Sequence, residues 1–134
     1  MSYRKKSYVE HAAVRVRDIQ WHIKFFREAL GMEMREIDGD AASPRQYWTI
    51  GGIQLISTPD LVAAPSNDAG WLAHLGIMVE DLDEAIAACR KFGVTQLPRG
   101  RNWLELPDGL AVELIQASGN AVAEMLVVNA RATP

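Results

Sequence analysis

An internal repeat constrains the fold of this chain more than any other feature of its sequence. When the sequence is shifted by 63 residues, His11 falls on His74, and further identities follow in the same frame: Val16 with Val79, Asp18 with Asp81, Ile23 with Ile86 and Arg27 with Arg90. In a frame of 59 residues, Gln54-Leu55-Ile56 lies over Glu113-Leu114-Ile115. Because self-similarity at a fixed spacing marks a duplicated unit, we predict two copies of one module, at about 8–58 and 71–117.

Each copy has the pattern of a strand followed by a helix and then by further strands. An apolar run of strand length comes first, and an aspartate that can cap a helix N-terminus follows it. These pairs are 9–16 with Asp18 and 72–79 with Asp81. Gly31 and Gly93 stand where a helix can end in the left-handed conformation. Later strands are predicted at 32–37, 46–50, 52–57, 94–97, 102–106 and 110–116, which makes the chain an α+β protein.

Composition narrows the class of protein. The chain has 134 residues, a length that fits a single domain over 1–134, and its net charge of −3 argues against nucleic-acid binding. Apolar runs are short and interrupted by charges, so no membrane-spanning helix is expected. The single cysteine, Cys89, is predicted to be a buried, inert thiol, and the absence of a disulfide framework favours a cytoplasmic protein. Residues 58–70 are predicted to link the modules, and 118–134 to form a C-terminal extension.

Strand alternation places four polar side chains on sheet faces that are otherwise small. Each has a glycine or alanine two residues away on the same face, which leaves space beside a polar group that needs a partner. The four are His11, Gln54, His74 and Glu113. Two sheets curling toward each other would bring them together. Two imidazoles, an amide oxygen and a carboxylate suit a divalent transition metal, so we predict that these residues bind one, with positions left open for substrate.

Both copies also carry motifs of a known family. The motifs are Val-Glu-His-Ala-Ala-Val-Arg-Val-Arg-Asp-Ile at 9–19, Phe-Phe-Arg-Glu-Ala-Leu-Gly-Met at 25–32, His-Leu-Gly-Ile-Met-Val-Glu-Asp-Leu at 74–82 and Pro-Asp-Gly-Leu-Ala-Val-Glu-Leu at 107–114. With these motifs in order, the chain resembles the vicinal oxygen chelate superfamily, which includes glyoxalase I, bleomycin-resistance proteins, methylmalonyl-CoA epimerase and extradiol dioxygenases. The resemblance implies two βαβββ modules that form a half-open, cup-shaped sheet around a metal ion. By position, its ligands fall on His11, Gln54, His74 and Glu113.

The resemblance further implies an enzyme that acts on a small molecule. The leading hypothesis is a lyase or isomerase that uses a divalent ion (Zn, Ni, Co, Mn or Fe) on an α-oxygenated carbonyl compound, through a metal-stabilised enediolate, with Glu113 moving the proton. One alternative is an Fe(II) ring-cleaving dioxygenase that does not use Gln54 as a ligand. Another is a non-catalytic protein of the bleomycin-resistance type that sequesters its ligand. A homodimer is expected, and the family builds its cup either within one chain or between two.

Five residues are predicted to contact the substrate. Arginines can hold an anionic group, and tryptophans can line a pocket for an apolar or planar ligand. Among the arginines, Arg15 lies on the cup face by alternation, and Arg101 is preferred over Arg45 and Arg99. The five are Arg15, Trp48, Met78, Arg101 and Trp103. His22 lies outside the repeated positions and is predicted to be an ordinary helix residue.

Overall fold

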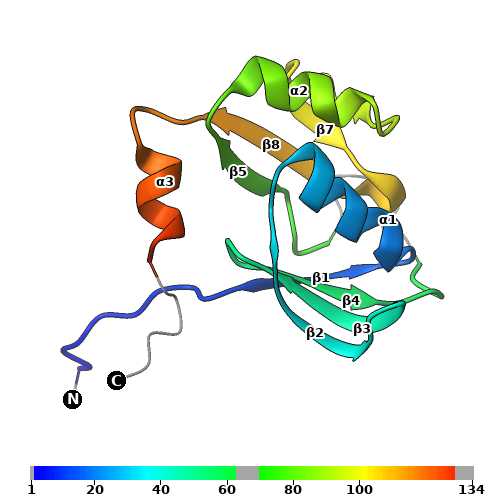
Figure 1. The fold of residues 1–134 in the computed structure, drawn as a ribbon, viewed down its shortest axis with the longest axis horizontal. Helices are drawn as coiled ribbons and strands as arrows, with labels where there is room; N and C mark the ends of the chain where they lie inside the picture. The colour runs from blue at the N-terminus through cyan, green and yellow to red at the C-terminus, as the bar shows by residue number, and fades with distance from the viewer. Residues whose placement is uncertain (1, 63–69, 129–134) are drawn as a thin grey trace.

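In a computed structural model, residues 2–62 and 70–128 are described. The middle of the predicted linker, 63–69, and the last residues of the predicted extension, 129–134, lie outside the described residues. The strands form two four-stranded sheets. In Figure 1, α1 lies between the two sheets and α2 lies over the second one. This arrangement confirms the predicted α+β class with two open sheets.

The first module forms a sheet of strand order β1-β4-β3-β2. Its strands are β1 (Ala12–Val16), β2 (Met34–Asp40), β3 (Ser43–Thr49) and β4 (Ile53–Ser57). Between β1 and β2, α1 (Ile19–Lys24) continues into the π-helical turn η1 (Phe25–Ala29). Strands β1 and β4 run parallel, whereas β3 is antiparallel to both of its neighbours. The first and last strands of the module therefore lie side by side.

The second module repeats this topology with the order β5-β8-β7-β6. Its elements are β5 (Leu75–Val79), α2 (Leu82–Arg90), β6 (Thr95–Gln96), β7 (Trp103–Glu105), the short 3-10 turn η2 (Pro107–Gly109) and β8 (Ala111–Gln116). Again the first and last strands, β5 and β8, are parallel. A short helix, α3 (Ala121–Leu126), follows and has no buried residue. In the described parts of the chain, no helix has both the length and the apolar character needed to span a membrane.

The predicted helix caps are confirmed. The Asp18 carboxylate accepts a hydrogen bond from the Trp21 amide, and the Asp81 carboxylate accepts one from the Glu84 amide. Gly31 and Gly93 follow the helices with φ of +66° and +73°. The predicted first strand of each module is too long, however, because regular pairing begins only at Ala12 and Leu75. His11 and His74 each directly precede a strand.

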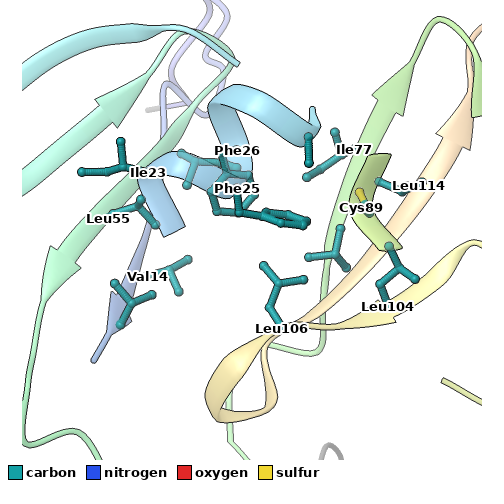
Figure 2. Close-up of a cluster of buried hydrophobic side chains, with 14 of the residues drawn as sticks. Val14, Ile23, Phe25, Phe26, Leu55, Ile77, Cys89, Leu104, Leu106 and Leu114 are labelled. Carbon is teal, nitrogen blue, oxygen red and sulfur yellow. The ribbon is translucent and has the colours of Figure 1, made fainter. Parts of the chain in front are cut away.

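One hydrophobic core lies between the two sheets (Figure 2). The first sheet contributes Val14 and Leu55, and the second contributes Ile77 and Leu114. Phe25 and Phe26 of η1 fill the space between them and are both 0% exposed. Strand alternation predicts that the branched aliphatic faces of the two sheets pack beneath the helices, and the buried cluster confirms this. Since each sheet turns this face inward, its opposite face, which carries the predicted metal ligands, is turned away from the core.

Candidate metal centre

In the second module, the structure brings His74 and Glu113 together. The register pairs Gly76 with Glu113 across β5 and β8, and His74 stands two residues before Gly76. His74 Nε2 lies 3.3 Å from Glu113 Oε2, and the two side chains remain about one third exposed, at 32% and 27%. Two donors bound to one ion at about 2.1 Å, with bond angles between octahedral and tetrahedral, are about 3.0–3.4 Å apart. The spacing therefore fits two ligands of a common metal ion.

In the first module, His11 and Gln54 occupy the equivalent places. Ala13 pairs with Gln54 just as Gly76 pairs with Glu113, and His11 stands two residues before Ala13. The Glu10 carboxylate contacts one side of the His11 ring, with Glu10 Oε2 3.3 Å from His11 Nδ1. An ion pair with Arg35 holds this carboxylate in turn, with the guanidinium nitrogen 2.7 Å from Glu10 Oε1. The Nδ1 atom is buried. Because a carboxylate at one imidazole nitrogen orients the other, Nε2 is the nitrogen available to a metal ion.

A hydrogen-bond chain fixes the direction of the Gln54 amide. Asp38 accepts hydrogen bonds from Arg45 at 3.0 Å and from Gln46 Nε2 at 3.1 Å, and these bonds lower the pKa of its carboxyl group. An ionised carboxylate only accepts, so Gln46 must turn its NH₂ group toward Asp38 and its oxygen toward Gln54. Gln54 Nε2 then donates to Gln46 Oε1. The Gln54 side-chain oxygen, which is the atom through which an amide binds a metal ion, therefore points away from Gln46 and remains available.

A tryptophan accompanies each half of the site. Trp48 lies opposite Gln54 in the register of β3 and β4, and Trp103 lies opposite Glu113 in the register of β7 and β8. Cross-strand partners share a sheet face, so both indoles lie on the faces of the predicted ligands. The Trp103 ring meets the His74 imidazole edge to face, with ring centroids 4.7 Å apart. The two tryptophans predicted to contact substrate thus occupy equivalent positions.

The other predicted substrate contacts differ in their surroundings. Arg15 and Met78 are exposed on the faces of β1 and β5 that carry the predicted ligands. Arg101 forms an ion pair with Asp83 of α2 at 2.7 Å. Its neighbour Arg99 instead lies over the Trp103 ring, with the guanidinium carbon 4.9 Å from the ring centroid. Arg99 thus contacts the same Trp103 ring that meets His74, whereas the sequence favoured Arg101.

A single chain does not gather all four predicted ligands. Figure 2 shows that the apolar faces of the two sheets point toward each other and into the shared core. The polar faces, on the opposite sides of the sheets, are therefore turned away from the core. Within residues 2–62 and 70–128, no three His, Cys, Asp or Glu side chains are grouped so that they could hold a metal ion. His11 thus does not join His74 and Glu113. One chain carries two separate half-sites, His11 with Gln54 and His74 with Glu113.

Two hollows adjoin these half-sites. One, of about 490 Å³, lies beside the second half-site and is lined by Gly70, Ala73, His74, Leu97, Pro98, Arg99, Trp103 and Ala111. The other is an open groove of about 1130 Å³ that follows the free edge of β5. Residues of β1, the Gly51–Gly52 turn, α2 and α3 also line this groove. It contains none of the predicted metal ligands.

Two ionisable groups outside the half-sites are shielded from solvent. Burial raises the pKa of the Cys89 thiol to about 11, which agrees with the prediction of a buried, inert thiol. Burial also lowers the pKa of His22, which is 0% exposed and whose Nδ1 lies 2.7 Å from the Asp18 carbonyl oxygen. His22 is a helix residue, as predicted, but it belongs to the core.

Sequence reasoning did not identify the residues that orient the predicted ligands. These are Glu10, Arg35, Asp38 and Gln46. Only Gln46 had a usable signal, because it stands two residues before Trp48 and therefore shares its strand face. Arg35 and Asp38 come from β2, and nothing in the repeat indicates which residues of that strand reach the first half-site.

Comparison with known proteins places the chain among relatives of this fold. A model of the family described as Glyoxalase/Bleomycin resistance protein/Dioxygenase superfamily matches residues 8–105. No curated protein matches the sequence at a significant level. Among solved structures, the trypanothione-dependent glyoxalase I of Leishmania major is 23% identical, with a TM-score of 0.64 over 83% of this chain and 87% of that chain.

Two further structures have the same fold but are proteins of different function. A fosfomycin resistance protein from Listeria monocytogenes is 16% identical, with a TM-score of 0.60 over 90% of this chain and 98% of that one. An antibiotic-binding protein from a Streptomyces species is 20% identical, with a TM-score of 0.55 over 87% and 100% of the two chains. At these identities the likeness shows the fold alone, so the function must be argued from the residues.

Proposed function

Because this chain belongs to the Glyoxalase/Bleomycin resistance protein/Dioxygenase superfamily, we propose that it is a divalent-metal-dependent lyase or isomerase acting on a small α-oxygenated carbonyl compound. The observation that carries this proposal is the 3.3 Å approach of His74 Nε2 to Glu113 Oε2 on an open sheet face. A glyoxalase I and a fosfomycin resistance protein among the structures of the same fold are consistent with chemistry on a small molecule.

The donor set fits a divalent ion. His11 Nε2, the Gln54 oxygen, His74 Nε2 and a Glu113 oxygen would hold it, with Zn, Ni, Co, Mn and Fe all compatible with these donors. When bound, such an ion polarises two neighbouring oxygens of a substrate and stabilises negative charge that develops on them. The chain itself orients the His11 imidazole through Glu10 at Nδ1, and it places His74 Nε2 next to Glu113, its proposed fellow ligand.

We propose that two copies of the chain complete the site. Among the described residues, β1 and β5 are the edge strands of their sheets, with no strand paired on their outer sides, and the half-sites lie next to these edges. Unpaired edges favour association with another strand, and apolar side chains lie close by: Met78 is 49% exposed and Met125 of α3 is 69% exposed. A dimer that sets β1 of one chain beside β5 of its partner would join His11 and Gln54 to the partner's His74 and Glu113.

Glu113 is the residue proposed to move the proton. It is the only carboxylate in the donor set, and its side chain is 27% exposed, so it can reach a substrate bound on the sheet face. A carboxylate beside a polarised carbonyl can accept the proton from the adjacent carbon and return it to a neighbouring position. The small residues Ala111 and Gly76 on the same face leave space for that substrate.

Metal content and proton exchange test this proposal together. The purified protein is stripped with a chelator, titrated with Zn²⁺ or Co²⁺, and then assayed by NMR for exchange of the α-protons of hydroxyacetone in D₂O. We expect tight binding of metal by the wild type and its loss in His74→Ala. At saturating metal, Glu113→Gln should abolish the exchange that the wild type catalyses. The control variant Glu28→Gln removes an exposed ion pair with Arg27 in η1 and should change neither result.

The alternatives predict different outcomes in the same protein. A ring-cleaving dioxygenase would consume oxygen with a catechol after anaerobic loading with Fe(II) and would tolerate Gln54→Ala. A sequestering protein would bind its ligand equally well without metal. Wild-type protein that takes up no metal, or a His74→Ala variant with unchanged metal content, would contradict the proposed function.

A further inference from the structure

The hollow beside the second half-site has the features of a substrate subsite. Its volume of about 490 Å³ falls within the range of small-molecule pockets. Its walls are mainly apolar, from Leu97, Pro98 and Ala111, and its polar groups are His74 and Arg99. Because His74 belongs to the predicted donor set, a ligand in this hollow would lie directly beside the metal centre. We call this hollow the Trp103 pocket, after the indole that lines it.

Trp103 and Arg99 give the pocket its chemical character. The Trp103 and His74 rings meet in a T-shaped contact, and the guanidinium group of Arg99 lies over part of the indole. Trp103 remains half-exposed, so the part of the indole that Arg99 does not cover offers an apolar surface for a planar group. In the described parts of the chain, no carboxylate forms an ion pair with Arg99, whereas Arg101 is already paired with Asp83. Arg99 therefore keeps its charge and its planar donors available for an anion.

Resting on the proposed function, we infer that the substrate is a planar, unsaturated carbonyl compound with an anionic group, placed by Trp103 and Arg99. The carbonyl end would lie toward His74 and Glu113, the flat part against the Trp103 indole, and the anionic group at the Arg99 guanidinium. Trp48 stands at the equivalent position of the other half-site. In a two-chain site, a second indole would thus face the same ligand. Trp103 and Arg99 are specificity-determining residues in this account, not proton-transfer groups.

Four small probes separate the contribution of the ring from that of the charge. Phenylglyoxylate has a ring, a ketone and a carboxylate; pyruvate lacks the ring; 1-phenyl-1,2-propanedione lacks the charge; and 2,3-butanedione lacks both. Affinities for the full-length, Zn²⁺-loaded protein are measured by calorimetry or NMR titration. We expect phenylglyoxylate to bind roughly ten-fold more tightly than either pyruvate or the phenyl diketone, since it makes both contacts. Added salt should weaken only the two anionic probes.

Matched variants assign each contribution to a residue. Arg99→Gln should remove the preference for the carboxylate and keep the preference for the ring, while Trp103→Leu should do the reverse. Arg27→Gln and Trp71→Leu are the controls, because Arg27 is an exposed residue of η1 paired with Glu28 and Trp71 is fully exposed at 106%. Equal affinity for all four probes, or the same losses in the control variants, would overturn the inference.

Metal content, measured in every variant, distinguishes this failure from failure of the proposed function. Normal Zn²⁺ uptake with no probe preference would overturn the assignment of the Trp103 pocket and leave the metal site intact. Preference for phenylglyoxylate in a protein that takes up no metal would support the pocket and contradict the metal-dependent enzyme. Repeating the titrations after chelation shows which of these two cases applies.

Discussion

At the residue scale, the direction of one amide decides whether Gln54 can bind a metal ion. The hydrogen bonds that link Asp38, Gln46 and Gln54 run in a fixed direction, because the Asp38 carboxylate can only accept a hydrogen bond, whereas each glutamine amide can both donate and accept. An asparagine at position 38 could donate as well as accept, which would allow both glutamine amides to turn over. The Gln54 oxygen would then point into the chain for part of the time.

We therefore predict that Asp38→Asn weakens metal binding by about ten-fold or more, the range found when partners of metal ligands are removed. Asp40→Asn is a suitable control, because Asp40 belongs to the same strand and accepts instead from the Ala42 amide, at 2.9 Å. Competition titration with a chromophoric chelator measures the affinity. Equal metal affinities of Asp38→Asn and the wild type would show that the hydrogen bonds from Asp38 through Gln46 do not orient Gln54 as a metal ligand.

His22 leads to a prediction about pH. Its Nδ1 contacts the Asp18 carbonyl oxygen, its Nε2 is buried without a hydrogen-bond partner among the described residues, and burial lowers its pKa from the ordinary value of 6.5. The folded chain therefore keeps His22 neutral at pH values where the unfolded chain has bound a proton. Unfolding takes up a proton in that window, so stability should fall as the pH decreases below about 6.5.

Denaturant unfolding across pH 5–8 tests this expectation. The contribution of His22 to the slope is at most about 1.4 kcal/mol per pH unit, the value for one proton. His22→Asn keeps a side-chain donor for the Asp18 carbonyl oxygen and cannot titrate, so its stability should vary less with pH in this range. An identical pH profile for the variant would assign the dependence to another group.

At the scale of elements, the turn before β4 positions His11. Gly52 has φ of +100°, its carbonyl oxygen accepts the Ala12 amide at 2.8 Å, and a Cβ added to it would lie 3.2 Å from the Glu10 carbonyl oxygen. Gly31 also has a positive φ, of +66°, but an added Cβ there would meet nothing within 4 Å. The two glycines share a backbone requirement, and only Gly52 has a close neighbour.

We expect Gly52→Ala to lower the free energy of unfolding by about 1–3 kcal/mol, the usual cost of a strained backbone conformation, and to weaken metal binding as the Glu10–His11 segment shifts. Gly31→Ala should cost less and should leave metal affinity unchanged. Thermal unfolding and metal titration of both variants give the comparison. A metal affinity unaffected by Gly52→Ala would mean that the close approach does not position His11.

The order of the strands and helices could be predicted from the sequence, because the repeat shows the sequence pattern of each element twice. Strand, helix cap and helix end recur in both copies, so local ambiguity in one is resolved by the other. The β2–β3 hairpin was the weak point. Its turn at Ala41-Ala42 has no glycine, asparagine or proline, and Pro44 lies inside β3, where a proline argues against a strand. The predicted strand 46–50 therefore missed Ser43.

The π-helical turn was also beyond prediction. In the sequence, Ile23 and Phe26 follow helical spacing and Phe25 does not, whereas the wider turn of η1 buries the adjacent Phe25 and Phe26 together. This packing depends on the contact between the modules: Phe25 meets Phe92 with ring centroids 5.5 Å apart. A tertiary contact of this kind has no signature in the local sequence.

At the scale of the whole molecule, the half-sites could be predicted and their assembly could not. Alternation and the repeat place His11 with Gln54 and His74 with Glu113 whichever way the modules pair. Whether one chain or two chains build the complete metal site depends on how the apolar faces of the two sheets pack together. Here both faces pack into one core, which turns the half-sites apart and favours a two-chain site.

The central claim is that each metal site takes one half from each of two chains, and complementation tests it most directly. His11→Ala and His74→Ala each damage both sites of a homodimer, so neither variant alone should bind metal tightly. In a mixed dimer, one site contains both substitutions and the other contains neither. With random pairing, unfolding and refolding an equal mixture should restore about a quarter of the wild-type metal sites. If each chain instead builds its own site, the mixture will bind no more tightly held metal than the separate variants, which would contradict the account.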